Sequence, residues 1–274
     1  MNRTILIVLL AVFAGLVSGW QWRGEMAPKR VQAQAVVNLP AGDLFSPAEK
    51  VNIGVYEQVN RSVVHITTMS ARLDSFLLFE TPTEGAGSGS VIDQKGHILT
   101  NYHVIAGARE IRVRLFDGQE YAAGLVGQDP LNDVAVIKIN APASSLIPIR
   151  LGDSSDLRVG QKIHAIGNPF GLERTYTVGI ISSLNRTLPA KNHRTLKSII
   201  QVDAALNQGN SGGPLLNSRA KLVGMNTAIA SRVGENSGVG FAIPVNTIKR
   251  VVPELIENGK LSRADIGITR VYQT

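Results

Sequence analysis

Residues 206–217 read LNQGNSGGPLLN, with one serine, Ser211, among three glycines directly before an apolar run. Glycine loses more conformational freedom on folding than any other residue, so a cluster of glycines marks a backbone that turns sharply or approaches a ligand closely. The stretch also fits the pattern G-x-S-x-G, in which the serine is a nucleophile. A serine nucleophile needs a base, and the positions of the candidate bases restrict the fold.

The order of histidine and serine along the chain excludes one fold. The five histidines, at positions 65, 97, 103, 164 and 193, all precede Ser211. An α/β-hydrolase needs its histidine after the serine, whereas two other architectures place the histidine first, in the order Asp-His-Ser or His-Asp-Ser. The Asp-His-Ser order belongs to an α/β architecture, so a sequence rich in strands favours His-Asp-Ser.

Short runs rich in valine and isoleucine, separated by glycine, asparagine or aspartate, dominate the chain between residues 63 and 244. They do not alternate with long helices, so a parallel α/β sheet is disfavoured and all-β barrels or sandwiches are expected. Residues 140–160 carry a weaker pattern and divide the strands into two sets. We expect strands at 63–68, 89–100, 110–116, 134–139, 162–167, 177–184, 222–229 and 238–244.

Two short helices are expected at the ends of this domain. Ser46 and Glu49 have the spacing of a capping box, which predicts a helix that ends near Val59. A second helix is expected to begin after residue 246 and to end near Gly259, because glycine favours the conformation that terminates a helix.

The composition is that of a globular protein. The 274 residues are 44% hydrophobic and 18% charged, which allows one large or two modest cores. Cysteine is absent, so neither a disulfide nor a thiolate metal site is expected. The formal net charge is +7, but the basic residues are scattered without an aromatic-interleaved stripe. We therefore favour a basic surface over nucleic-acid binding.

The first 22 residues are predicted to be a signal peptide or an N-terminal membrane anchor. The apolar run from Ile5 to Val17 has the length of a signal peptide and is short for a full membrane span. Two tryptophans follow this run and favour a retained anchor, because indole rings prefer the headgroup layer. Residues 23–45 alternate small, polar and proline residues and are expected to be a linker.

His103 and Asp133 are the best candidates for the base and for the group that orients it. His103 follows residues 98–101 (ILTN), so its imidazole can project from a turn at the end of a strand. Asp133 precedes the strand at 134–139, where a partly buried carboxylate needs a partner. An aspartate before a strand is also a common turn residue, and a lone histidine is often a satisfied core or surface group. Spacing alone leaves both interpretations open.

Five ordered blocks resemble the HtrA/Deg branch of the trypsin-like serine proteases. In order they are LTNYHVI, DPLNDVAVIKI, GNPFGL, QVDAALNQGNSGGPLLN and GVGFAIP. The resemblance implies an all-β protease domain at about 46–260, built from two six-stranded antiparallel β-barrels. The first barrel is expected at about 60–145 and the second at about 160–245.

The same resemblance implies a catalytic triad of His103, Asp133 and Ser211. It places the oxyanion hole at Gly209, Asn210 and Ser211, with the main-chain amides of Gly209 and Ser211 as donors to the oxygen that gains charge. Asn210 stands where many relatives have an aspartate that captures a newly cut amino terminus, so activation by propeptide cleavage is not expected. Neither a metal nor a cofactor is implied.

The substrate pocket and a regulatory residue also follow from the resemblance. Ala205 lies six residues before the serine, where an acidic residue would select lysine or arginine. An uncharged pocket should prefer small or medium aliphatic residues, because a cationic side chain would be desolvated there without a partner. A basic stretch at 185–197, expected to be a solvated loop, matches the regulatory loop of the branch and contains Arg186. The expected pocket residues are Ala205, Leu206, Asn207 and Ile229.

Two further segments carry expectations. Residues 75–80 (SFLLFE) place four large apolar side chains in an expected loop. Their expected roles are packing on the barrel, joining the subunits of a trimer as in relatives, or contact with a membrane or an unfolded substrate. Residues 261–274 resemble the lead-in to a PDZ domain, and no such domain is expected within this sequence.

Taken with the resemblance, the sequence predicts a serine endopeptidase that cleaves misfolded or unfolded proteins through an acyl-enzyme. The expected location is extracytoplasmic, in the periplasm or cell envelope, with membrane association through the N-terminal segment and with a possible homotrimer. Two alternatives remain. A holdase or scaffold would bind unfolded chains without efficient proteolysis, and an esterase would act on small acyl substrates.

Overall fold

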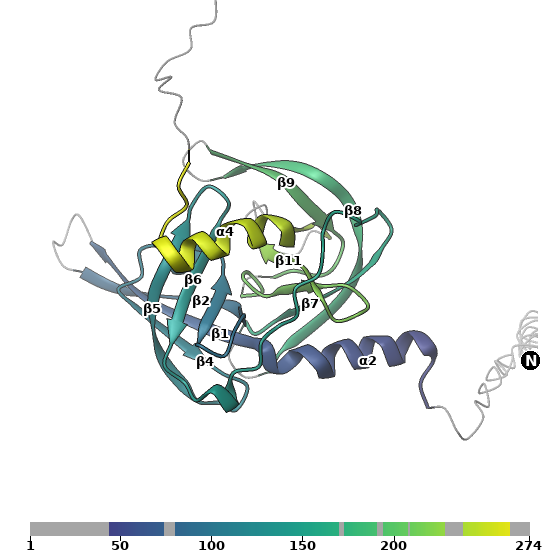
Figure 1. The fold of residues 1–274 in the computed structure, drawn as a ribbon, viewed down its shortest axis with the longest axis horizontal. Coiled ribbons are helices and arrows are strands. Elements are labelled where there is room, and N and C mark those ends of the chain that lie inside the picture. The colour runs from purple at the N-terminus through teal and green to yellow at the C-terminus, as the bar shows by residue number, and fades with distance from the viewer. Residues whose placement is uncertain are drawn as a thin grey trace, which may run out of the picture. The chain divides into compact units, whose positions relative to one another are not determined.

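Two closed antiparallel barrels of six strands each make up the described part of the chain (Figure 1). The computed structural model describes residues 44–73, 80–169, 173–190, 194–207, 209–227 and 238–263. The expectations for the N-terminal segment, for residues 75–79, for Ile229 and for the tail beyond residue 263 lie outside these ranges.

The first barrel has the strand order β1-β2-β3-β6-β5-β4. Taken around the ring, the second barrel has the order β7-β8-β9-β12-β11-β10, so both barrels repeat the same connectivity. The expected fold class of two six-stranded antiparallel barrels is confirmed. The strands of the first barrel are β1 (Val63–Leu73), β2 (Glu80–Val91), β3 (His97–Thr100), β4 (Glu110–Arg114), β5 (Glu120–Asp129) and β6 (Val134–Ile139). Those of the second are β7 (Lys162–Gly167), β8 (Thr175–Ala190), β9 (Arg194–Val202), β10 (Pro214–Leu216), β11 (Leu222–Thr227) and β12 (Gly240–Pro244).

The helix at the start of the domain, α2 (Pro47–Val59), begins as the sequence predicts. The Ser46 hydroxyl accepts a hydrogen bond from the Glu49 amide (3.3 Å), and the Glu49 carboxylate accepts one from the Ser46 amide (2.7 Å). These reciprocal bonds satisfy two amides that the first helical turn leaves unpaired. Val55 and Val59 are buried on the inner face of the helix.

The helix at the end of the domain, α4 (Val245–Asn258), contacts strands of both barrels. It lies against β5 and β6 of the first barrel and against β11 and β12 of the second. It buries Ile248, Val251 and Leu255, and it ends at Gly259, whose φ of 71° lies in the left-handed region that glycine adopts without strain. The helix therefore ties the two barrels together.

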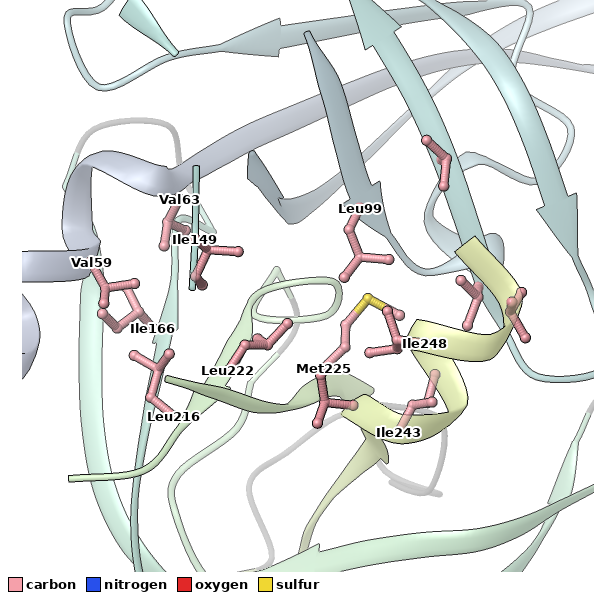
Figure 2. Close-up of a cluster of buried hydrophobic side chains, with 14 of the residues drawn as sticks. Val59, Val63, Leu99, Ile149, Ile166, Leu216, Leu222, Met225, Ile243 and Ile248 are labelled. Carbon is pink, nitrogen blue, oxygen red and sulfur yellow. The ribbon is translucent and has the colours of Figure 1, made fainter. Parts of the chain in front are cut away.

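Three apolar clusters form the core. One is built almost entirely from the first barrel and another from the second. The largest cluster lies between the barrels and takes side chains from both of them and from α2 and α4. Figure 2 shows part of it, with Met225 of β11 pointing toward Leu99 of β3 and Ile248 of α4. Burial on this scale fixes the positions of the two barrels relative to each other.

The basic stretch at 185–197 differs from the sequence expectation. Residues 185–190 and 194–197 continue β8 and β9 as an antiparallel pair rather than forming a solvated loop. Leu196 is buried and its cross-strand partner Leu188 packs beside the same cluster, so each strand of this polar stretch supplies an apolar contact. Asn185 and Ser198 have positive φ values of 61° and 57°, and the register shifts in this part of the pair. The sequence analysis did not predict strands here, because the stretch is rich in basic residues and its few apolar residues show their role only through their burial.

Candidate active site

The turn that connects β5 to β6 has a buried aspartate at each end, Asp129 and Asp133. The Asp129 carboxylate at its start accepts hydrogen bonds from the Leu131 amide (3.1 Å) and the Asn132 side chain, and it forms an ion pair with Arg263 (2.7 Å). The Asp129 side chain is fully buried, so these donors are needed to offset its desolvation. They hold the turn that places Asp133 directly before the first residue of β6.

Asp133 is strained and tightly bound. Its φ of 55° lies in the left-handed region, which costs a residue with a side chain about 1–2 kcal/mol. Two donors bind its carbonyl oxygen, the Tyr102 amide at 3.2 Å and the Asn101 side-chain amide at 3.1 Å. Such contacts are expected where surrounding structure maintains a strained residue for a function.

The Asp133 carboxylate receives donors from both barrels. In the short helix α3 (Tyr102–Ile105), the His103 amide donates to Oδ1 (2.9 Å), and His103 Nδ1 lies 2.8 Å from Oδ2. The hydroxyl of Thr227, at the end of β11 in the second barrel, donates to Oδ2 (3.1 Å). A carboxylate only accepts hydrogen bonds, so the proton of neutral His103 sits on Nδ1 and its Nε2 is free to accept a proton.

The imidazole and the carboxylate differ in exposure. The side chain of His103 is 32% exposed, whereas that of Asp133 is 5% exposed. The imidazole is thus accessible from solvent, while the carboxylate that binds it is shielded from water. A candidate general base must come within hydrogen-bond reach of the proton that it accepts, and the exposure of the His103 ring allows this.

Ser211 lies in a turn that both barrels hold. Its carbonyl oxygen accepts from the Ser88 amide of β2 (2.8 Å), and the next residue, Gly212, donates to the Asn226 carbonyl of β11 (2.9 Å). The Asn226 amide returns a bond to the Gly213 carbonyl (2.9 Å). Ser211 is 5% exposed. The nucleophile candidate is therefore placed by first-barrel and second-barrel contacts together.

Close packing explains the glycines around Ser211. Gly209 and Gly212 have φ values of 89° and 84°, which residues with a side chain rarely adopt. A Cβ atom at Gly209 would lie 2.5 Å from the Cα of Pro169, and one at Gly212 would collide with the Ser88 carbonyl. The glycines are thus required by a sharp turn packed between the barrels. The atoms that leave no room for a side chain at Gly209 and Gly212 are atoms of the protein itself.

The expected pocket residues are in different environments. Ala205 is half-buried and Asn207 is exposed, with its carbonyl accepting from the Asn210 amide (3.1 Å). Leu206 packs into the second-barrel core, where a Cβ atom at Gly240 would lie 2.7 Å from its Cδ1. The structure therefore gives Leu206 a core contact that the sequence did not predict, because β12 lies far along the chain.

Arg186 lies on β8 and is exposed. Its Nε donates to the side-chain oxygen of Gln201 on the neighbouring strand β9 (2.8 Å). The described contacts do not bring it to His103 or Ser211. Its role in regulation stays a prediction.

Three residues near the site escaped the sequence analysis, namely Ser88, Asn101 and Thr227. Each bonds a residue more than 30 positions away, to Gly209, Asp133 and Asp133 respectively. The run of small residues at 85–90, GAGSGS, is a signal from which a close approach of another segment could have been predicted. Within the described ranges, no group of three or more acidic or histidine side chains is arranged to hold a metal ion.

Comparison with known proteins decides the family. A trypsin-like peptidase domain model matches residues 87–225. Protease Do-like 5, chloroplastic, from Arabidopsis thaliana is 44% identical over 230 residues, which cover 77% of this chain and 71% of that protein. The chain belongs to the Deg/HtrA family of trypsin-like peptidases. The resemblance noted in the sequence is thereby confirmed.

Other Deg/HtrA proteins extend the comparison. Protease Do-like 1, chloroplastic, from Arabidopsis thaliana is 50% identical over 223 residues, which cover 80% of this chain and 51% of the relative. The periplasmic serine endoprotease DegP of Escherichia coli is 47% identical over 184 residues, covering 66% of this chain and 38% of DegP. The chain thus spans about half of the first relative and less of the second.

Solved structures agree with the family assignment. A variant of the HtrA-type protease AlgW with a decapeptide superposes with a TM-score of 0.74 at 35% identity, covering 81% of this chain and 72% of that one. The crystal structure of Deg5 superposes with a TM-score of 0.65 at 39% identity, covering 80% of this chain and all of that one (100%). The two-barrel architecture is therefore that of the Deg/HtrA fold. None of the helices in the described ranges has both the length and the apolar character needed to traverse a bilayer.

Proposed function

We propose that this protein is a serine endopeptidase in which His103, Asp133 and Ser211 form the catalytic triad. The observation that carries the proposal is the binding of the Asp133 carboxylate to both His103 nitrogen donors, the main-chain amide and Nδ1. This binding fixes the tautomer and the orientation of the ring and leaves Nε2 as the base. The Thr227 hydroxyl adds a donor from the barrel that carries Ser211.

The proposed reaction proceeds in two halves. His103 Nε2 accepts the hydroxyl proton of Ser211 as Oγ attacks the carbonyl carbon of the peptide bond. His103 then donates this proton to the leaving amine as the C–N bond breaks, which leaves an ester between Ser211 and the acyl fragment. Water adds to the ester with His103 again as base, and the acid is released with Ser211 restored.

The main-chain amides of Gly209 and Ser211 are proposed to stabilise the tetrahedral intermediate. Its oxygen gains a negative charge, and preorganised amides in a partly dry site bind such a charge better than water does. The turn around Ser211 supports this role, because contacts to both barrels limit its reorganisation. The neutral side chain of Asn210 supports regulation by loop rearrangement rather than by capture of a new amino terminus.

The proposed substrates are exposed segments of misfolded or unfolded proteins, with a small or medium aliphatic residue before the cleaved bond. Ala205 supports this preference, since no acidic side chain stands at that position to bind a cation. An extracytoplasmic location, an N-terminal anchor and a homotrimer are proposed with it. The location is supported by the names of relatives, one periplasmic and one chloroplastic.

Casein digestion tests the proposal. The parent protein should cleave casein, the Ser211→Ala variant should be inactive, and Asp133→Asn should lower kcat by on the order of 10⁴-fold, because the neutral amide favours the wrong histidine tautomer. A holdase would protect a denatured protein from aggregation equally well with and without Ser211, and it would release no fragments. Turnover of small esters without any peptide cleavage would instead identify an esterase.

A further inference from the structure

We propose that Ser88 is a positioning residue that fixes the turn carrying the oxyanion donors. This inference rests on the proposed function and assigns a role to a residue of the first barrel. Ser88 lies in β2, and its side chain is fully buried (0% exposed). Its amide donates to the Ser211 carbonyl (2.8 Å), and its hydroxyl donates to the Gly209 carbonyl (2.6 Å). One residue thus binds the nucleophile turn on both sides of Asn210.

The direction of the Ser88 hydroxyl is itself fixed. While it donates to Gly209, its oxygen accepts from the Asn168 amide (2.8 Å). The carbonyl of Ser88 accepts from the Thr100 hydroxyl (2.8 Å). All the polar groups of Ser88 are therefore used, and a hydroxyl with both a donor and an acceptor has little freedom to rotate.

A buried histidine, His65, binds the same residue, Asn168, whose amide donates to the Ser88 hydroxyl. His65 pairs with Ser88 across β1 and β2, and its Nδ1 donates to the Asn168 carbonyl (2.6 Å). The Thr67 hydroxyl lies 3.1 Å from His65 Nε2. The hydrogen bonds therefore run from His65 through the main chain of Asn168 and the Ser88 hydroxyl to Gly209. This chain of bonds joins the first barrel to the nucleophile turn of the second.

The geometry shows why this matters for an oxyanion hole. The Gly209 carbonyl belongs to the peptide plane between residues 209 and 210, and the Ser211 carbonyl to the plane between 211 and 212. The plane between them carries the Ser211 amide, a proposed oxyanion donor. Gly209 has no side chain to restrict its φ and ψ angles, so the turn would otherwise have several accessible conformations. Ser88 binds both flanking planes and so restricts the plane between them.

Replacement of Ser88 by alanine should therefore slow the chemical step. The Ser88→Ala variant keeps the amide bond to Ser211 but loses the hydroxyl bonds to Gly209 and Asn168. Because an oxyanion donor stabilises the transition state more than the bound substrate, kcat should fall about tenfold or more while KM stays within about twofold. Cleavage of a fluorogenic peptide with valine before the cleaved bond measures both constants.

Ser90→Ala is the matched control. Ser90 lies two residues further along β2 and is 1% exposed, and its hydroxyl has no hydrogen-bond partner among the described residues. The same chemical change at this position should leave kcat within about twofold of the parent value. Thermal unfolding of each variant gives the folded fraction at the assay temperature. If Ser88→Ala does not fold, Ser88→Cys, which keeps the side-chain shape with a somewhat larger atom and donates weakly, should give the reduced kcat instead.

The outcomes separate the two proposals. A selective fall of kcat in Ser88→Ala or Ser88→Cys, in a fully folded variant, supports the positioning role. Equal kcat values for the variants at Ser88 and Ser90, or a loss no larger than the loss of folded protein, would overturn it while leaving the serine mechanism intact. Peptide cleavage that persists in Ser211→Ala would instead overturn the proposed function itself.

Discussion

His164 is fully buried in β7 and makes two polar contacts. Its Nδ1 lies 2.6 Å from the Tyr176 hydroxyl and its Nε2 3.3 Å from the Ser218 hydroxyl. Burial, with the nearby positive charge of Lys162, lowers the pKa of His164 to about 4. Burial also raises the pKa of Tyr176 to about 12. Both groups are therefore neutral at pH 7, and their hydrogen bonds do not involve a formal charge.

The buried imidazole should make stability depend on pH. The pKa of His164 is about 4 in the folded protein and about 6.5 in the unfolded chain, so between these values the unfolded chain binds more protons. The free energy of unfolding should therefore rise with pH across this window. Above it, where His164 is neutral in both states, this group should cause no further change. Urea unfolding between pH 4.5 and 8, in the Ser211→Ala background to prevent self-cleavage, measures the effect.

His164→Gln is the comparison for that experiment, because glutamine keeps polar atoms at the site and does not titrate. Its unfolding free energy should change less with pH between about 4 and 6.5 than that of the parent. Identical slopes for the two proteins would show that His164 is not the group responsible.

The residues of the proposed triad could be selected from the sequence, whereas the residues that hold them could not. The position of every histidine before Ser211 restricted the fold, and the five ordered blocks then singled out His103 and Asp133. Thr227 and Ser88 carry no such signal. Their partners lie 94 and 121 residues away, so their roles arise only when the second barrel meets the first.

At the scale of elements, α4 and β5 meet at a glycine. A Cβ atom at Gly127 would lie 2.6 Å from the Leu255 carbonyl and 2.7 Å from the Gly259 carbonyl. The end of the helix therefore approaches the strand more closely than any larger residue allows. Gly124, three residues earlier in the same strand, has no heavy atom within 4 Å of the corresponding position.

Gly127→Ala should destabilise the protein by about 1–3 kcal/mol, because the helix or the strand must move to admit the methyl group. Gly124→Ala makes the same substitution without a neighbour and should be neutral or slightly stabilising. Chemical denaturation of both variants measures the difference. If they unfold at the same denaturant concentration, α4 and β5 are not packed as closely as described.

The elements that the sequence predicted have strong local signals, and those it missed lack them. The capping box at Ser46 and the glycine after α4 are short-range features, and α2 begins and α4 ends where these features lie. Strands β5, β9 and β10 were missed. The first has alanines and glycines in place of the large apolar residues that mark a strand, the second begins in a basic stretch, and the third has only three residues. Their pairing with neighbouring strands stabilises them, and a local pattern does not show that pairing.

At the scale of the whole domain, the candidate site depends on the junction of the barrels. Asp133 and His103 come from the first barrel, Thr227 and Ser211 from the second, and the largest apolar cluster packs between the two. The first barrel alone would hold two of the three proposed triad residues, and the second barrel alone would hold only Ser211. The strand pattern of the sequence predicted two sets of strands. The expectation that the two sets meet at the site came from the family resemblance, because composition and periodicity give no information on how the barrels pack.

Fluorophosphonate labelling followed by peptide mapping tests the central claim, that the imidazole of one barrel activates the serine of the other. In the presence of casein, the parent protein should carry a single adduct on the peptide that contains Ser211. Labelling should vanish in Ser211→Ala and slow by at least about 100-fold in His103→Ala, because the hydroxyl then has no base. An adduct on another residue, or an unchanged labelling rate in His103→Ala, would contradict the mechanism.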